Sequence, residues 1–241
     1  MTNIRLDDVS KNYKVYQFVD YYSMSTDSFL LPYFANVPRS KKKNIMELCS
    51  GNGGISIALR EKTEAVLEML EIQDELVELT KKSIEYNKLE NISVRQGDIK
   101  NIKSYYRPSS FDYILCNPPY FPIENMPSQK EKFNHNISRH EILCNLDDVA
   151  HAIRHLLKQN GKFAVVHRSY RLADIIATFF KYGLGIKRIR FVYSKKSSDV
   201  SKIVLLEGSI SKVSDIKIEQ PLYIYNEDDS YSEEMKKVYG L

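Results

Sequence analysis

Residues 44–54, NIMELCSGNGG, decide the fold of this sequence. Residues 44–48 form a short, largely apolar run that predicts a buried strand. Residues 50–54 are small and glycine-rich, which predicts a tight turn, and residues 55–62 are expected to form a helix. A strand that passes through such a turn into a helix is typical of open α/β sheets, in which ligands bind beyond the carboxyl ends of the strands.

The same alternation continues along the chain. Further strands are expected at residues 66–72, 92–96, 111–116 and 162–166, and two late strands at 187–193 and 203–207. Helical patterns occupy residues 74–87, 147–159 and 171–182, and Asn-Gly at 160–161 is expected to stop the second of these helices. Strands that alternate with helices predict an α/β fold with a mostly parallel sheet covered by helices on both faces.

The sequence has no linker, internal repeat or low-complexity block. We therefore expect effectively one domain, with an N-terminal segment at 1–43 and the main domain at 44–241. With 43% hydrophobic and 27% charged residues, the composition is ordinary for a soluble globular protein. No apolar run reaches the roughly 18 residues of a membrane span, and the N-terminus lacks a signal-peptide pattern. These features predict a cytoplasmic protein without membrane attachment.

Cysteine spacing and charge narrow the kinds of site. The three cysteines, Cys49, Cys116 and Cys144, are too widely spaced for a disulfide framework or a C-x-x-C metal site. We expect reduced structural thiols and no metal. The net charge of +4 permits a polyanionic partner without requiring one. Basic residues cluster at 39–43 and at 181–196, where they could contact nucleic acid or form a solvated surface.

An acidic residue, Glu47, precedes the glycine turn. Gly51 and Gly53 allow the tight turn and the close approach of a ligand to the main chain. The turn lacks the Lys-Ser/Thr of a phosphate loop, and Ser56 stands where a dinucleotide fingerprint has its third glycine. A carboxylate here would accept hydrogen bonds from an ammonium group and repel a diphosphate. The charge therefore favours S-adenosylmethionine, which carries an ammonium and a sulfonium, over NAD; a simple tight turn is the alternative.

Acidic residues also follow the next two expected strands. Glu71 ends the second strand, where a carboxylate suits the two ribose hydroxyls of a cofactor, and Ile72 after it could flank an adenine. Asp98, after the third strand, could accept a hydrogen bond from the adenine amine, and its neighbour Ile99 is a further cofactor-binding candidate. The alternatives are an exposed strand-end carboxylate for Glu71 and a turn-forming residue for Asp98.

Residues 117–120, Asn-Pro-Pro-Tyr, come directly after the fourth expected strand. The prolines have a fixed φ and no N–H, so they hold the preceding carbonyl groups in place. The Asn117 side-chain oxygen and the Pro118 carbonyl could accept hydrogen bonds from an exocyclic amine, expose its lone pair and stabilise the charge that develops as a methyl group is transferred. Tyr120, helped by Phe121, could stack on a planar substrate. A proline-rich turn with an ordinary Asn cap is the alternative.

With this motif the sequence resembles the class I, Rossmann-like methyltransferases that modify amino nitrogens. Stretches at 25–31, 139–141, 166–168, 188–193 and 204–208 are similar to those of the bacterial family that methylates N6 of adenosine 37 in a valine tRNA. The resemblance implies a mostly parallel seven-stranded sheet with a late antiparallel strand pair. It also implies S-adenosylmethionine as the cofactor and tRNA as the partner.

Carried over residue by residue, the resemblance implies a role for each candidate. The cofactor's methionine part would be held by Glu47 and Gly51, its ribose by Glu71 and its adenine by Asp98. Asn117 is a candidate for contacts with both the cofactor and the target base, which Tyr120 would also address. Asp27, in the first of the similar stretches, would lie near the methionine end or the target pocket.

The Asn-Pro-Pro-Tyr motif does not decide the substrate, because members of the group act on adenine in DNA or RNA, on guanine in rRNA and on glutamine in release factors. RNA phosphates would be contacted by Arg139, Arg188, Arg190 and Lys195. Release-factor enzymes usually carry a sizeable N-terminal helical domain, whereas about 43 residues precede the first core strand here. This favours RNA. We also expect a monomer. A non-catalytic RNA-binding protein is the alternative from another class.

Overall fold

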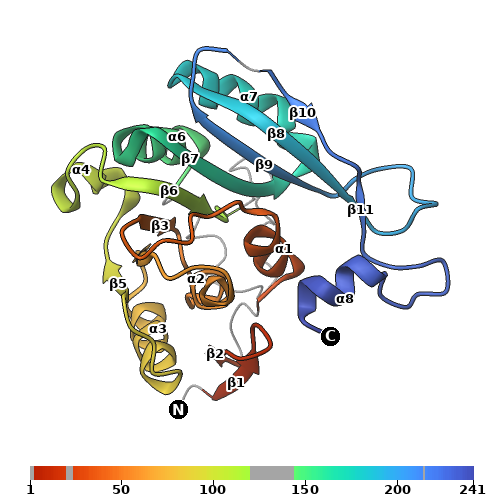
Figure 1. Cartoon of the computed structure of the whole chain (residues 1–241), viewed down its shortest axis with the longest axis horizontal. Coiled ribbons are helices and arrows are strands. Elements are labelled where there is room, and N and C mark those ends of the chain that lie inside the picture. The colour runs from red at the N-terminus through yellow and green to blue at the C-terminus, as the bar shows by residue number, and fades with distance from the viewer. Residues whose placement is uncertain (1–2, 20–23, 120–143, 214) are drawn as a thin grey trace, which may run out of the picture.

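The strand expected at residues 44–48 lies inside a nine-stranded sheet (Figure 1). The computed structural model describes residues 3–19, 24–119, 144–213 and 215–241. The strands follow the order β10-β8-β9-β7-β6-β3-β4-β5, and β11 also pairs with β8. Their bounds are β3 Asn44–Leu48, β4 Val66–Glu71, β5 Ile92–Gln96, β6 Phe111–Cys116, β7 Leu157–Arg168, β8 Leu184–Tyr193, β9 Ile203–Ile210, β10 Lys217–Ile218 and β11 Leu222–Tyr223.

All seven expected strands are present, and the short strands β10 and β11 add to them. Strand β3 runs parallel to β4 and β6, β4 to β5, and β6 to β7. Strand β9 is antiparallel to both β7 and β8, which confirms the late antiparallel pair. Because β8 therefore runs in the same direction as β7, the carboxyl ends of β3 to β8 lie at one edge of the sheet, called the carboxyl edge below. The opposite edge is the amino edge.

Helices cover both faces of the sheet, as expected. Among the described residues they are α1 Thr26–Phe34, α2 Gly54–Ala58, α3 Asp74–Tyr86, α4 Ile102–Tyr105, α6 Leu146–Leu156, α7 Leu172–Lys181 and α8 Glu233–Tyr239, with 3-10 turns η1 Leu59–Glu61, η2 Ile99–Asn101 and η4 Ser169–Arg171. Neighbouring residues of β3 point to opposite faces. Met46 packs into the core that includes residues of α6 and α7, whereas Ile45 packs into the core formed with α1, α2 and α8.

One expected boundary is wrong. The helix expected at 147–159 ends at Leu156, and strand β7 begins at Leu157, so Asn160 and Gly161 lie within the strand. Leu157 is fully buried and pairs with Phe111 of β6. A Cβ on Gly161 would come within 2.7 Å of the Leu157 side chain. The glycine therefore permits close packing at an irregular strand start rather than ending a helix.

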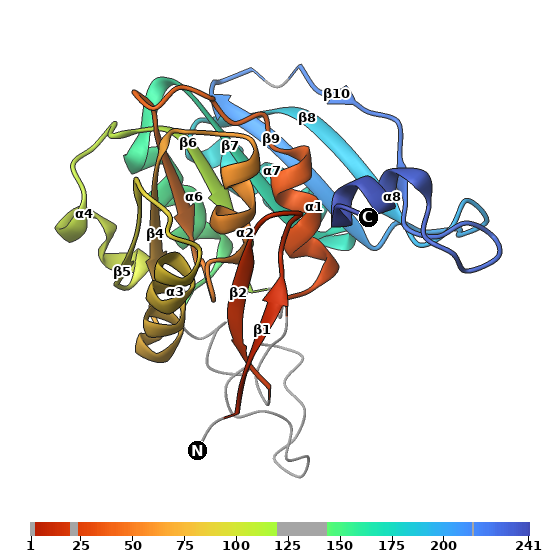
Figure 2. The same cartoon turned by 60° about the horizontal axis from the view of Figure 1, so that its bottom comes forward.

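The N-terminal segment contains a β-hairpin that the sequence did not reveal (Figure 2). Strands β1 (Ile4–Asp8) and β2 (Lys14–Phe18) form an antiparallel pair separate from the main sheet. Val9 and Val15 of this hairpin are buried against Ile57 of α2. The Asn87 side chain also accepts from the Lys14 N–H at 3.0 Å. The division of the chain at residue 44 stays a prediction.

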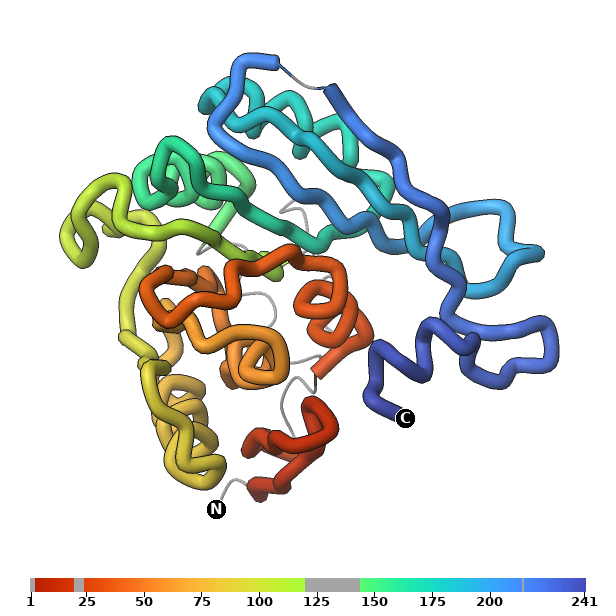
Figure 3. The backbone as a smooth tube through the Cα atoms, viewed as in Figure 1, coloured from red at the N-terminus to blue at the C-terminus, as the bar shows by residue number. Residues whose placement is uncertain are grey.

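The C-terminal segment ends beside α1 (Figures 1 and 3). The Tyr239 ring of α8 meets the Phe29 ring of α1 edge-on, with centroids 5.0 Å apart. Met235 of α8 is fully buried in the same core. The last helix is thus an integral part of the layer that covers this face of the sheet.

A buried ion pair joins the late strands to the rest of the sheet. Glu207 of β9 is 5% exposed and accepts hydrogen bonds from the Tyr113 hydroxyl at 2.6 Å and from Arg188 Nη1 at 2.8 Å. The Asn36 N–H also donates to it, at 3.2 Å. The guanidinium of Arg188 lies 3.9 Å from the centroid of the Phe34 ring. A carboxylate buried in this way is tolerated only while its donors remain.

Replacing the cation of this pair should destabilise the fold strongly. We expect Arg188→Met to lower the free energy of unfolding by about 3–5 kcal/mol, because it leaves the Glu207 charge buried without its partner. Lys195→Met is the matched control, since Lys195 pairs with Asp229 at the solvent-exposed surface, and its unfolding midpoint should match that of the wild type. Urea unfolding followed by circular dichroism measures both. Equal unfolding midpoints for Arg188→Met and the wild type would show that the buried ion pair of Arg188 with Glu207 contributes no stability.

Candidate active site

A buried carboxyl group lies at the carboxyl end of β3. Glu47 is 1% exposed, and its Oε2 accepts a hydrogen bond from the Ser56 N–H of α2 at 3.0 Å. Its Oε1 is buried without a hydrogen-bond partner among the described residues. Burial raises the pKa of Glu47 to about 8, although the Ser56 hydrogen bond opposes this rise and the nearby Glu71 adds to it. An acceptor oxygen that lacks a donor fits an ammonium group of a ligand.

The turn after β3 leaves an open space beside the main chain. Gly51 and Gly53 have φ values of +57° and +76°, a region that favours glycine. A Cβ on Gly51 would meet no atom within 4 Å, whereas a Cβ on Gly53 would lie 2.6 Å from Thr80 Cγ2. Gly53 is therefore needed for packing. Gly51 faces a space that a ligand could fill.

Glu71 supports this turn from the end of β4. It is 5% exposed, and its Oε2 accepts from the Gly51 N–H at 2.8 Å. Its Oε1 accepts from the Gln73 N–H at 3.1 Å. The alternative of an exposed strand-end carboxylate is therefore wrong. Each carboxylate oxygen can accept more than one hydrogen bond, so the ribose role of Glu71 stays a prediction, as does that of the half-buried Ile72 beside it.

Asp98 is a turn-forming residue, as the alternative to its role in cofactor binding predicted. Its Oδ1 accepts from the Lys100 N–H at 2.9 Å and caps η2. The preceding Gly97 N–H donates to the Glu71 carbonyl at 2.8 Å, which holds this turn beside β4. Ile99 is buried. The expected hydrogen bond from an adenine amine to Asp98 stays a prediction. In that contact the carboxylate would accept from the adenine while it also caps η2.

The Asn-Pro-Pro segment leaves β6 next to the glycine turn. Cys116, the last residue of β6, is in register with Leu48 of β3 on one side and with Val165 of β7 on the other. Asn117 therefore starts at the level of the sheet where the glycine turn also begins, and Pro118 is buried. The remaining expected residues of the target pocket, Tyr120, Phe121 and Arg139, lie outside the described residues.

A second acidic side chain lies at the carboxyl edge. Asp27, in the first turn of α1, is 2% exposed, and its Oδ2 is 4.0 Å from Arg168 Nη2 at the end of β7. Arg168 lies in one of the stretches that resemble the tRNA methyltransferase family, but its position in the sequence indicated no role. His167 beside it is buried, and its Nδ1 accepts from the Arg168 N–H at 2.8 Å. Burial lowers the pKa of His167 to about 4, so its ring is neutral at physiological pH.

The three cysteines converge in one part of the core. All three belong to or pack against the same cluster of buried residues, and Cys116 and Cys144 both influence the pKa of Cys49. None is in a disulfide. Hydrogen bonding to Cys116, together with burial, raises the pKa of Cys49, and burial raises that of Cys116. Such thiols are poor nucleophiles. Because the three cysteines are far apart in the sequence, their proximity in the fold could not be predicted from it.

Arg188, Arg190 and Lys195, the basic residues within the described ranges that were expected to contact RNA, form ion pairs with the rest of the chain. Arg188 pairs with Glu207, as described above. Both terminal nitrogens of Arg190 donate to the Glu234 carboxylate at 2.7 Å, and Lys195 Nζ lies 2.8 Å from Asp229 Oδ1. The Arg190–Glu234 pair holds α8 against β8, whereas the Lys195–Asp229 pair lies at the exposed surface. Binding of RNA phosphates by the three basic residues stays a prediction.

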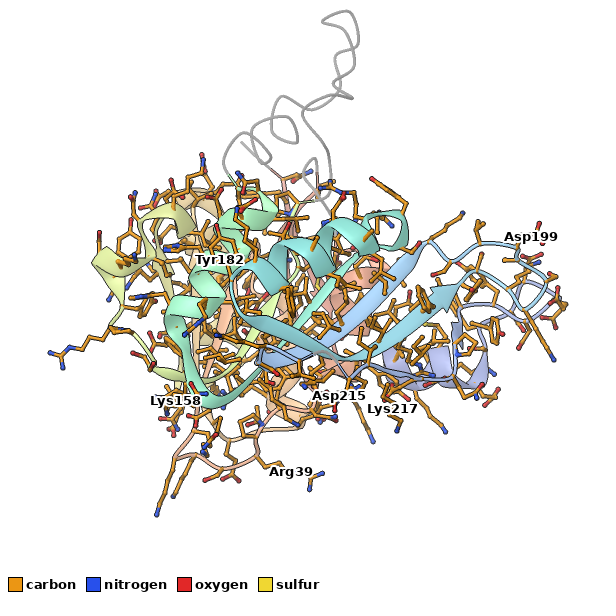
Figure 4. The ribbon with its side chains drawn as sticks, turned by 90° about the horizontal axis from the view of Figure 1, so that it is seen from above. Arg39, Lys158, Tyr182, Asp199, Asp215 and Lys217 are labelled. Atoms are coloured by element: carbon orange, nitrogen blue, oxygen red, sulfur yellow. The ribbon has the colours of Figure 1, made fainter. Side chains whose placement is uncertain are left out.

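The other basic cluster lies away from the candidate site. Figure 4 shows Arg39 and Lys158, which precede or begin strands β3 and β7, on the opposite side of the molecule from Asp199 in the turn between β8 and β9. The cluster at 39–43 is therefore at the amino edge. Among the described residues, no group of acidic, histidine and cysteine side chains could hold a metal ion. No helix in the same ranges is long and apolar enough to cross a membrane.

Several known proteins are similar to this chain. A family model described as a methyltransferase domain matches residues 39–199. A tRNA1(Val) (adenine(37)-N6)-methyltransferase from Phocaeicola vulgatus is 26% identical over 222 residues, which cover 90% of this chain and 92% of that protein. A protein of the same name from Shewanella loihica is 26% identical and covers 78% and 77%, respectively.

Solved structures share the fold. A structure described as a predicted O-methyltransferase from Agrobacterium tumefaciens superposes with a TM-score of 0.69 at 15% identity, covering 88% of this chain and 95% of that chain. TrmN from Thermus thermophilus gives a TM-score of 0.56 at 14% identity and covers 76% of this chain and 48% of that one. At these identities the likeness concerns the fold alone, and it supports the expected class I architecture.

The two glycines of the turn should respond differently to the same substitution. Gly51→Ala places its methyl group in the open space, so we expect it to weaken binding of the expected cofactor at least tenfold. Its stability should fall by only about 1 kcal/mol, the cost of a side chain at positive φ. Gly53→Ala should lower stability further because its methyl group meets Thr80. Isothermal titration with S-adenosylmethionine and thermal unfolding separate the two effects. If Gly51→Ala bound the cofactor as tightly as the wild type, the cofactor could not occupy the open space beside Gly51.

Proposed function

The chain belongs to the methyltransferase domain family, and from this premise we propose that it transfers a methyl group from S-adenosylmethionine to N6 of adenosine 37 in a tRNA, with valine tRNA as the expected substrate. The observation that carries the proposal is the meeting of two segments at the carboxyl edge. Glu47 lies near the end of β3 and the turn with Gly51 follows that strand, and Asn117 follows β6, the direct neighbour of β3 in the sheet. A donor of methyl groups and an acceptor nitrogen can thus be held side by side.

The residues around the glycine turn fit the cofactor. The orphan oxygen of Glu47 would accept from the α-ammonium group, and the open face of Gly51 would admit the ligand to the main chain. Glu71 and Asp98, tied together through the Gly97 N–H, would address the ribose and the adenine. When bound, S-adenosylmethionine supplies an electrophilic methyl group on a sulfonium centre.

Asn117 and Pro118 would prepare the nitrogen that receives the methyl group. The lone pair of an adenine N6 is delocalised into the ring, which makes the amine a weak nucleophile. If the Asn117 side-chain oxygen and the Pro118 carbonyl accept its two N–H groups, the lone pair is turned out of conjugation and toward the methyl donor. The positive charge that develops on nitrogen is then stabilised by dipoles that are already oriented. Once the N–C bond has formed and the C–S bond has broken, the methylated nitrogen would lose its surplus proton to water, so the neutral, buried His167 is not needed as a base in this scheme.

The choice of tRNA is supported by the relatives. Two that carry the name tRNA1(Val) (adenine(37)-N6)-methyltransferase cover most of this chain. A monomer that acts in the cytoplasm, where tRNA is modified, is part of the same proposal. Methylation of guanine in rRNA, of adenine in DNA or of a release-factor glutamine uses the same arrangement of Asn and Pro. No contact in the described residues favours one of these over tRNA.

Removing the Asn117 side chain should separate binding from chemistry. We expect Asn117→Ala to lower kcat by about 100-fold to 1000-fold, the range seen when one preoriented polar group at a reaction centre is lost. Affinity for tRNA should stay near that of the wild type. The measurement uses labelled S-adenosylmethionine and tRNA from a strain that lacks this protein, followed by nucleoside mass spectrometry. N2-methylguanosine as the product, or label in protein alone, would contradict the proposal. A wild type that binds tRNA without methylating it would favour the non-catalytic alternative.

Cofactor affinity should depend on pH through Glu47. Its carboxyl group has a pKa of about 8 in the free protein and is therefore mostly protonated at pH 7. An ammonium ligand prefers the ionised form, so binding must release this proton. The dissociation constant should rise as pH falls from 8 to 6, by up to about tenfold per pH unit. Titration calorimetry in buffers of different ionisation enthalpy measures the released proton.

Glu47→Gln provides the matched control, because it keeps an oxygen that can accept from the Ser56 N–H. Its cofactor affinity should be lower than that of the wild type and nearly constant between pH 6 and pH 7.5. A variant that retains the wild-type pH dependence would show that another group is responsible.

A further inference from the structure

An exposed tyrosine stands at the carboxyl edge. Tyr170 lies in η4, directly after β7, and is 69% exposed, more than any other aromatic side chain in the described part of the chain. Tyrosine is enriched at binding interfaces, because its ring offers a large apolar face and its hydroxyl a polar tip. No step of the proposed reaction uses this residue.

Cationic side chains surround Tyr170. Arg168 and Arg171 flank it in sequence, and Lys202 lies across from them, since the Ser169 N–H donates to the Lys202 carbonyl at 3.2 Å. Lys202 is exposed. Arg168 lies near the buried Asp27, whereas Arg171 pairs with the exposed Asp174, so the three cations of this surface outnumber the two carboxylates beside them. This group of Arg168, Tyr170, Arg171 and Lys202 is called the Tyr170 shelf below.

The Tyr170 shelf is close to the position expected for the target base. Because Cys116 is in register with Val165, Asn117 stands level with Val166 on the neighbouring strand β7. Arg168 is two residues further along β7, which corresponds to about 7 Å at the usual rise of a strand. A nucleic-acid strand whose base enters the site beside Asn117 would therefore pass over the shelf.

We propose that the Tyr170 shelf binds the unpaired nucleotide next to the target adenosine, with the Tyr170 ring stacked on its base and Arg168, Arg171 and Lys202 beside its phosphates. This inference rests on the proposed function. Unpaired bases of an RNA loop expose flat faces that stack on aromatic side chains. Stacking tolerates any base, so the shelf positions the strand, while the target pocket selects the adenosine.

The charge around Tyr170 favours RNA over a protein partner. Helix α7 continues from the shelf with an exposed apolar ring, Phe180, near the amino edge. A protein-binding stripe along α7 would use Phe180 as well as Tyr170. A nucleotide at the carboxyl edge would use Tyr170 alone, which makes Phe180→Ala the matched control.

The test compares Tyr170→Ala, Tyr170→Phe and Phe180→Ala with the wild type. The substrate is valine tRNA assembled by ligation, with an intact nucleotide or an abasic one on either side of adenosine 37. We expect Tyr170→Ala to raise both the Kd and the KM for tRNA by a factor of about 5 to 150, the range for one stacked base. Its kcat, its thermal midpoint and its Kd for S-adenosylmethionine should stay unchanged. Tyr170→Phe should bind within about twofold of the wild type, because the ring that stacks is kept.

The abasic substrates identify the stacked nucleotide. With the stacked base removed, wild type and Tyr170→Ala should bind equally, whereas an abasic nucleotide on the other side should preserve their difference. Lys202→Met should also reduce the slope of log K against log salt concentration by about 0.7–0.9, as expected for one lost phosphate contact. Phe180→Ala should match the wild type throughout.

Specific results would overturn the inference. One is that Tyr170→Ala binds tRNA with the same Kd as the wild type. Another is that the Kd of this variant is raised by the same factor for the intact substrate and for both abasic substrates. A comparable loss in Phe180→Ala would favour a protein-binding stripe instead. A wild type that binds tRNA but methylates none overturns the proposed function, and the shelf is then judged from the Kd values alone. A wild type that binds no tRNA overturns both.

Discussion

The parallel pairing of β3 with β6 is the constraint on which the site depends. Leu48 and Cys116 are in register, so the glycine turn and the Asn-Pro-Pro segment leave the sheet at the same level. Side chains fix this register: Ile45 and its partner Tyr113 pack into one core, and Met46 and Ile114 pack into the other. A slip by one residue would exchange these two sets of side chains between the faces. The hydrophobic core therefore also sets the distance between the proposed positions of the methyl donor and the acceptor.

The same placement imposes an electrostatic cost at Glu47. Its carboxyl group is buried with one oxygen lacking a donor, and its pKa is raised to about 8. Because the folded state prefers the neutral form, this group favours folding most at low pH, and its contribution is lost as pH rises from the unfolded value near 4.5 through 8. In the proposed function, an ammonium group bound at Glu47 would reverse that preference and stabilise the folded chain by mass action. The proposed role of Glu47 in binding would therefore come at the expense of stability in the free protein.

Much of the fold and part of the site could be predicted from sequence because their signals are local. Short apolar runs gave the strands, and the expected strands at 44–48, 92–96 and 111–116 have the observed bounds. Acidic and Asn residues directly after these runs had to fall at the carboxyl edge once the strands were parallel. Non-local packing could not be read in this way. The hairpin at residues 4–18, the strand start at Leu157 and the meeting of the three thiols all depend on contacts between distant segments.

Positive charge was the least informative signal for phosphate-binding residues, because the sequence does not show which basic side chains already form ion pairs within the protein. Arg188 and Arg190 suggested phosphate ligands, yet their side chains are only 13% and 14% exposed and pair with Glu207 and Glu234. A phosphate that recruited Arg188 would have to leave the Glu207 carboxylate buried without its cation, which is strongly unfavourable. Exposed pairs, such as that of Arg171 with Asp174, separate at little cost. Phosphate binding near the site is therefore better served by weakly held cations at the carboxyl edge, whereas the buried arginines keep the late strands and the C-terminal segment in place.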